Sequence, residues 1–192
     1  EIVIVGEERR APYQRPPLSK NYLAGQMAAE QVMLKPEKFY AERTIELKLG
    51  TRVATIDRAA MAVRLESGES LAYSKLLLAT GSRPRKLAIP GADLPGMHYL
   101  RTLADVDAIR AEMASGKRAV VIGAGYIGLE AAAVAAGAGM NVCVLEAAER
   151  VLGRVSGPLV ADFIADAHRT QGVDLRCGVR IEALEGSGRV QS

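Results

Sequence analysis

Three glycines and one acid carry the clearest chemistry in this sequence. Gly123, Gly125 and Gly128 form a Gly-x-Gly-x-x-Gly pattern, and Glu146 follows 18 residues after the last of them. In such a pattern the first glycine allows a tight turn, the second lets a pyrophosphate approach the backbone, and the third lets a helix pack closely. The acid accepts hydrogen bonds from the ribose hydroxyls of an adenosine. These residues predict a dinucleotide-binding site.

The same acid bears on the choice of nicotinamide cofactor. A carboxylate repels the 2′-phosphate of NADP, so Glu146 favours NAD. Arg150 and Arg154 follow within the next eight residues and would soften that preference. The alternative interpretation is a packing turn between a strand and a helix that holds no ligand.

The elements around the glycines have the order that a dinucleotide site needs. Apolar residues at 119–122 predict a buried parallel strand that leads into the turn. A helix of small residues is expected over 129–138, with its N-terminus facing the phosphates. A second apolar strand over 141–146 ends in the acid. This context favours the dinucleotide interpretation over the packing turn.

The remaining sequence predicts an α/β protein with an antiparallel insertion. A short strand at 2–5 precedes a proline-rich segment, a short helix at 17–23 and another helix at 36–43. Alternating strands at 45–49, 52–57, 62–66 and 70–73 predict an antiparallel meander, and a buried strand is expected at 75–82. The second half predicts helices at 102–113 and 158–170 and strands at 173–177 and 179–185. In the last helix, apolar residues recur at helical spacing at positions 159, 163, 164 and 167.

Composition limits the other possibilities. The 192 residues carry a net charge of +3 and are 49% hydrophobic, which fits one or two globular domains. No lysine and arginine run is long enough to predict nucleic-acid binding, and no apolar run is long enough to cross a bilayer. Cys143 and Cys177 form no Cys-x-x-Cys unit, and His98 and His168 have no metal-ligand spacing, so no metal is predicted. Buried thiols in a reducing compartment are expected, which indicates the cytoplasm.

Four segments occur in an order that is typical of one family. They are residues 12–20 (PYQRPPLSK), 78–81 (LATG), 99–102 (YLRT) and 123–130 (GAGYIGLE). Together they resemble the FAD-dependent ferredoxin reductases that supply electrons to oxygenases. The resemblance implies NADH as hydride donor, FAD as carrier and a ferredoxin-type iron–sulfur protein as acceptor. It also implies two dinucleotide-binding domains and a third domain.

The resemblance assigns roles to individual residues. For FAD, Glu7 would hold the adenosine ribose, and Arg15 and Lys20 would line the flavin. The other implied FAD contacts are Val53, Ala79, Thr80, Gly81 and Arg101. For NAD, the implied contacts are Gly123, Gly125, Tyr126, Ile127, Gly128, Glu130, Glu146 and Arg154. Lys20 and Glu130 are expected to form an ion pair beside the reacting cofactors and to be the catalytic residues. The alternative is that both are ordinary surface charges.

The domain organisation follows from the same resemblance. Residues 1–98 would form part of an FAD-binding domain with the β meander, and residues 99–192 a Rossmann-like NAD-binding domain. The family places one FAD motif before Ile2 and another after Ser192, so the sequence is expected to be a piece of a longer protein.

Three other functions remain open at this point. A disulfide reductase would need a cysteine pair near residues 12–20, and none is present. The second alternative is a different flavoprotein NAD(P)H reductase. The third is a nicotinamide-binding module without catalysis. The sequence makes no prediction of the oligomeric state.

Overall fold

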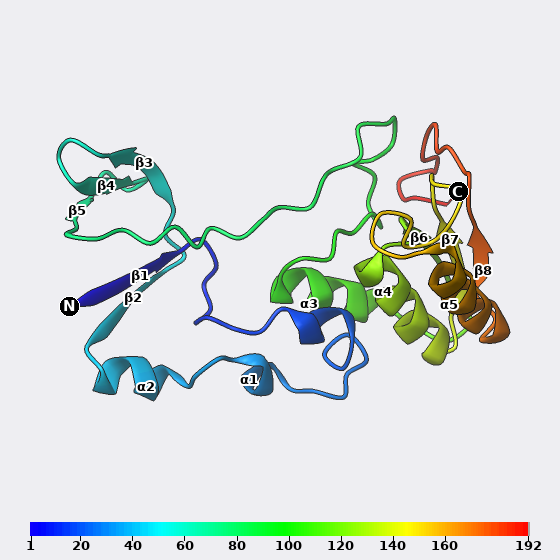
Figure 1. Ribbon diagram of the computed structural model, residues 1–192, viewed down its shortest axis with the longest axis horizontal. Helices are drawn as coiled ribbons and strands as arrows, with labels where there is room; N and C mark the ends of the chain where they lie inside the picture. Colours follow the sequence, from blue (N-terminus) through cyan, green and yellow to red (C-terminus); the bar gives the residue numbers. More distant parts are fainter. Residues whose placement is uncertain (192) are drawn as a thin grey trace. The chain divides into compact units, whose positions relative to one another are not determined.

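The computed structural model describes residues 1–191 and divides the chain into two compact units (Figure 1). The first unit contains Glu1–Gln14 and Glu30–Ser82. The second unit contains Arg15–Ala29 and the residues from Arg83 onwards. The chain therefore leaves the first unit, contributes one short segment to the second, and returns.

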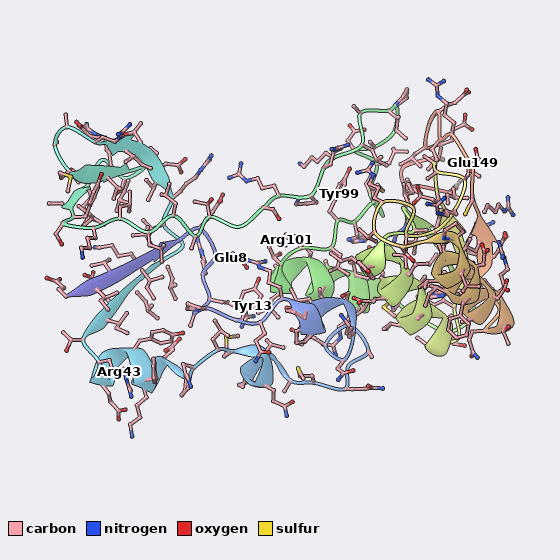
Figure 2. All side chains as sticks on the ribbon, viewed as in Figure 1. Glu8, Tyr13, Arg43, Tyr99, Arg101 and Glu149 are labelled. Carbon is pink, nitrogen blue, oxygen red and sulfur yellow. The ribbon has the colours of Figure 1, made fainter. Side chains whose placement is uncertain are left out.

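The first unit begins with two parallel strands. β1 (Ile2–Gly6) pairs with β2 (Ile45–Leu49), and α1 (Ala29–Val32) and α2 (Glu37–Glu42) lie between them in the sequence. Figure 2 labels Tyr13 and Glu8 on the segment after β1, where the tyrosine hydroxyl donates to the Glu8 carboxylate. The prediction that residues 45–49 belong to the antiparallel meander is wrong. Alternation identifies a strand, but it does not tell which partner will pair with it.

The meander itself is confirmed. β3 (Val53–Asp57), β4 (Ala62–Leu65) and β5 (Ser70–Ala72) form an antiparallel sheet in that order. Val63 and Leu65 of the central strand are buried. Residues 75–82, in contrast, form no strand, and Leu77 is 87% exposed. A strand needs a neighbour for its backbone groups, and no strand among residues 1–191 pairs with this segment.

The second unit contains a three-stranded parallel sheet. β6 (Arg118–Ile122), β7 (Asn141–Leu145) and β8 (Asp174–Arg176) are adjacent in that order. α4 (Tyr126–Gly137) connects the first two strands and α5 (Pro158–Thr170) the last two. Because such crossovers are right-handed, both helices lie on one face of the sheet. The core lies between these helices and the strands and includes Leu129, Val142, Val144 and Leu175.

The two helices differ from their predictions in start and in face. α4 begins at Tyr126, three residues before its predicted start. α5 has its predicted bounds, but it buries Ala161 and Ala165 while Leu159 and Phe163 are 85% and 71% exposed. Small side chains let α5 approach the sheet closely, and the sequence does not reveal that preference. Residues 179–185 form no strand.

A capped helix and a short turn complete the second unit. α3 (Leu103–Glu112) has the predicted capping box, in which Thr102 Oγ1 accepts from Asp105 N at 3.2 Å and Asp105 Oδ2 accepts from Thr102 N at 2.7 Å. The 3₁₀ helix η1 (Pro16–Ser19) packs against both α3 and α4. Within residues 1–191, no helix is long and apolar enough to cross a membrane.

Candidate functional site: the glycine turn and the Lys20–Glu130 pair

The sheet register brings the glycine turn and the acid to one edge. Ile122 at the end of β6 lies opposite Leu145 at the end of β7, so Gly123 and Glu146 leave the sheet side by side. The Gly123 N–H donates to the Leu145 carbonyl at 2.8 Å. Gly123 has a φ of +100°, a conformation that favours glycine. The carboxyl edge of a parallel sheet is where α/β proteins bind their ligands.

The other two glycines differ in what surrounds them. A Cβ on Gly125 would meet nothing within 4 Å, so open space lies in front of the turn. A Cβ on Gly128 would lie 2.0 Å from the Gly123 carbonyl oxygen, so only glycine fits where the helix crosses the turn. Gly125 is the N-cap of α4, and no side chain caps the helix. The exposed first turn of α4 therefore fits a pyrophosphate, which accepts from free backbone N–H groups.

The Glu146 carboxylate is held by backbone N–H groups of two loops, the glycine turn and the loop after β7. Its Oε2 accepts from Ala124 N at 2.7 Å, and its Oε1 accepts from Ala148 N at 2.8 Å. Each carboxylate oxygen has further acceptor capacity. The side chain is thus fixed in place and still able to accept from two ribose hydroxyls.

The loop after β7 also holds the glycine turn, which sequence reasoning missed. Leu152 N donates to the Ala124 carbonyl at 3.0 Å, so both backbone groups of Ala124 are fixed. Leu152 is buried and has a φ of +51°, a strained value for a bulky residue. No sequence pattern marks such a leucine. Arg154, predicted to contact NAD, is exposed on the same loop.

The predicted ion pair is present in the second unit. Lys20 Nζ lies 2.8 Å from Glu130 Oε1, and Lys20 Nζ also donates to the Pro16 carbonyl at 3.3 Å. Glu130 projects from the second turn of α4, the helix that begins at the glycine turn. Ser19 Oγ donates to the other carboxylate oxygen, Oε2, at 2.5 Å. Sequence reasoning missed Ser19, because a lone serine beside the lysine gives no signal of its own.

The ion pair lies at a groove of about 650 Å³. The turn at 19–26 forms one wall and α4 the other, with Arg110 and Met113 from the end of α3. Tyr22 in that turn is buried, and its hydroxyl donates to Asp107 of α3 at 2.6 Å. The turn that carries Lys20 is therefore anchored on both helices.

The residues predicted to contact FAD fall into two groups, one in each unit. In the second unit, Arg15 Nη1 donates to the Arg101 carbonyl at 2.7 Å. Arg101 lies just before α3 (Figure 2), and its buried Nε has no hydrogen-bond partner within residues 1–191. A buried guanidinium nitrogen without a partner fits a contact to a polar ligand.

The other group lies in the first unit. Glu7 is exposed directly after β1 and lines a hollow with residues 47–52, Glu66, Ser67 and Glu69. Val53 begins β3. Ala79, Thr80 and Gly81 are exposed and belong to the segment that forms no strand. Lys48 in the hollow pairs with Glu69 and Glu46, and the Glu69 contact is the main cause that raises the pKa of this lysine.

The surroundings of the two cysteines are unlike those of a reactive thiol. Both Cys143 and Cys177 are free and partly buried. Burial raises the pKa of both thiols, and the carboxylate of Asp174 adds to the effect at Cys143. Reactive thiols need the opposite shift. Within residues 1–191, no cluster of three or more histidine, cysteine or acidic side chains is suited to hold a metal ion.

Comparison with known proteins identifies related sequences and structures. The family model described as pyridine nucleotide-disulphide oxidoreductase matches residues 1–192. A probable ferredoxin reductase of Castellaniella defragrans is 44% identical, over 99% of this chain and 47% of that protein. The solved covalent complex of putidaredoxin reductase with putidaredoxin is 43% identical with a TM-score of 0.96, over 99% of this chain and 47% of that chain.

A more distant structure shares the same arrangement. It is a water-forming NADH oxidase from Lactobacillus brevis bound to NADH, 25% identical with a TM-score of 0.89, over 97% of this chain and 43% of that chain. The chain spans about half the length of the ferredoxin reductase and putidaredoxin reductase that it matches.

Proposed function

Because the chain belongs to the pyridine nucleotide-disulphide oxidoreductase family, we propose that it takes part in hydride transfer from NADH to FAD. The electrons would then pass singly to a ferredoxin-type iron–sulfur protein. The observation that carries this proposal is the Lys20–Glu130 ion pair, because it joins a predicted flavin contact to the helix of the glycine turn.

The glycine turn and Glu146 would hold NADH. The first turn of α4, including Tyr126, Ile127 and Gly128, offers backbone N–H groups to the pyrophosphate. Glu146 offers two fixed carboxylate oxygens to the ribose and disfavours a 2′-phosphate. Arg154 would contact the outer part of the adenosine.

Each unit carries its own group of predicted FAD contacts. Arg15, Lys20 and Arg101 form the group in the second unit, and the group in the first unit is Glu7, Val53, Ala79, Thr80 and Gly81. When bound, FAD would supply the conversion of one hydride into a proton and two singly transferred electrons, which no side chain supplies. Residues 1–98 would thus belong to an FAD-binding domain and residues 99–192 to an NAD-binding domain.

Lys20 and Glu130 would act together beside the reacting centres. The ammonium of Lys20 would supply a positive charge that stabilises negative charge on the flavin. Glu130 neutralises that cation before the reaction, because an unpaired charge in a partly buried site is costly. The carboxylate also limits the positions of Lys20, since it shares the ammonium with the Pro16 carbonyl.

The proposed partner follows from the relatives. The most similar relatives reported above are named as reductases of ferredoxin and putidaredoxin, and one forms a covalent complex with putidaredoxin. Neither cysteine of this chain lies within residues 12–20, which disfavours a dithiol as electron acceptor. We place the protein in the cytoplasm, where reduced thiols such as Cys143 and Cys177 persist.

A second candidate is a nicotinamide-binding module without catalysis. It is favoured by the exposure of residues 79–81, which the reductase would use to contact FAD. In this case NADH binds at the glycine turn and no flavin is reduced.

The two candidates differ in a simple spectroscopic experiment. The chain is mixed with FAD, freed of unbound flavin and titrated with NADH without oxygen. Bleaching of bound flavin supports the reductase. In that case Lys20→Met should slow bleaching about tenfold or more, while NADH affinity changes by less than about twofold. A colourless protein that still binds NADH supports the nicotinamide-binding module instead.

A further inference from the structure

Ser19 stands out as a buried polar side chain next to the ion pair. Within residues 1–191, Ser19 is the buried residue of the polar and charged types, with 4% of its surface exposed. A buried hydroxyl needs a hydrogen-bond partner, and Ser19 Oγ finds it in Glu130 Oε2 at 2.5 Å. The serine ends η1 and the glutamate lies on α4, so the bond joins two elements that are distant in sequence.

The two oxygens of the Glu130 carboxylate have different partners. Oε2 accepts from the Ser19 hydroxyl, and Oε1 faces the Lys20 ammonium at 2.8 Å. The last torsion of a glutamate side chain is intrinsically broad, so the carboxylate plane must be set by its partners. Lys20 is flexible and about half exposed, so it is a weak constraint on that plane. The buried, short-stemmed serine is the stronger constraint.

We propose that Ser19 is a positioning residue, which fixes the Glu130 carboxylate so that one oxygen is presented to Lys20. The inference deepens the proposed function and rests on it for its catalytic meaning. Ser19 and Lys20 would thus each hold one oxygen of the Glu130 carboxylate. The three residues would act as one hydrogen-bonded group.

The test measures Lys20 directly, without any bound cofactor. Trace labelling with acetic anhydride, followed by mass spectrometry, gives the rate at which Lys20 is acetylated. Lys38 is the internal standard, because it lies on α2 in the other unit and is highly exposed. The variants are Ser19→Ala, Ser19→Thr, Glu130→Ala and the double variant Ser19→Ala/Glu130→Ala.

Loss of the hydroxyl should loosen the ion pair and expose the ammonium. Ser19→Ala should raise Lys20 acetylation about two- to fivefold relative to Lys38, the size of effect expected for a weak, partly exposed pair. Ser19→Thr keeps a hydroxyl and should restore the wild-type rate. In the Glu130→Ala background, Ser19→Ala should add nothing, because the carboxylate through which it acts is gone.

Two results would overturn the inference. One is an unchanged Lys20 rate in Ser19→Ala. The other is an equal rise in both backgrounds, which would mean that the alanine loosens the turn without acting through Glu130. Thermal unfolding of all variants shows whether the fold is kept.

Flavin bleaching by NADH separates this inference from the proposed function. If labelling changes as expected and bleaching is slowed in Ser19→Ala with unchanged NADH affinity, both hold. If labelling changes as expected while bleaching does not, Ser19 still positions the pair, and the catalytic role proposed for the pair fails.

Discussion

At the scale of single residues, the site depends on side chains that fix the backbone. Glu146 accepts from the N–H groups of Ala124 and Ala148, which belong to the two loops that face each other at the sheet edge. The same carboxylate is proposed to accept hydrogen bonds from the ribose hydroxyls of NADH. Its structural and binding roles should therefore be lost together.

Glu146→Ala should weaken NADH binding about tenfold and lower the free energy of unfolding by about 1–2 kcal/mol, since two N–H groups lose a charged acceptor. Glu146→Gln keeps one acceptor oxygen and should fall between the alanine variant and the wild type. NADH fluorescence titration and thermal unfolding measure both effects. Glu149→Ala, an exposed acid on the same loop, is the matched control and should change neither. Unaltered NADH affinity in Glu146→Ala would contradict the proposed ribose contact.

The cysteines give a prediction about pH. Because burial raises the pKa of Cys143 and Cys177, both thiols hold their protons more tightly in the folded chain than in the unfolded chain. Their contribution to stability is complete below the ordinary thiol pKa and is lost as the pH rises through the raised values. Iodoacetamide should therefore alkylate the folded chain more slowly than the unfolded chain at pH 8, with a rate midpoint shifted to higher pH. A midpoint below the ordinary value would contradict this.

At the scale of elements, α5 is joined to α4 by His168. The His168 ring is half-buried, with Nδ1 2.9 Å from the Ile164 carbonyl and Nε2 3.1 Å from the Leu129 carbonyl. Leu129 lies in the first half of α4, directly before Glu130. The histidine thus connects α5 to the part of α4 that carries the site.

Replacing this ring should loosen the contact between the helices. His168→Leu should lower the free energy of unfolding by about 1–2 kcal/mol, because the hydrogen bond between the His168 ring and the Leu129 carbonyl is lost. Arg169→Gln is the control, since its ion pair with Asp166 is exposed and should contribute at most about 0.5 kcal/mol. Urea unfolding of the two variants makes the comparison. Equal stabilities would show that His168 does not hold the helices together.

At the scale of the whole molecule, the segment Arg15–Ala29 belongs to the second unit. In the sequence, Glu30–Ser82 of the first unit lies between this segment and the rest of the second unit. Leu18, Tyr22 and Leu23 of this segment are almost completely buried. Its hydrogen bonds to Asp107 and Glu130 reach α3 and α4. The unit that contains the glycine turn is therefore completed by a segment from early in the chain.

This arrangement predicts complementation by a peptide. A fragment of residues 83–191 should be less stable than the same unit in the whole chain, because it exposes the apolar surface that Leu18, Tyr22 and Leu23 cover. A synthetic peptide of residues 15–29 should raise its melting temperature in a concentration-dependent manner. A peptide with Tyr22→Ala is the matched control and should raise it less. No response to the unaltered peptide would contradict the division into units.

The elements whose signals are local can be predicted from the sequence alone. The strand, glycine turn, helix and acid around residues 119–146 follow from apolar runs, backbone freedom and the missing side chain of Gly128, so they were predicted near their bounds. The capping box at Thr102 and Asp105 is equally local. The resemblance to a family added the Lys20–Glu130 pair, and the structure confirms that contact. The assigned roles of the site residues stay predictions.

Which residues come into contact depends on the tertiary fold. Residues 45–49 alternate as an antiparallel strand would, yet they pair in parallel with β1. Residues 75–82 are apolar enough for a strand, but no strand within residues 1–191 pairs with them. Ser19 and Leu152 carry no sequence signal, because one depends on a distant carboxylate and the other on a backbone angle. Periodicity reports how apolar a segment is, whereas pairing, burial and polar contacts depend on what the rest of the chain brings beside it.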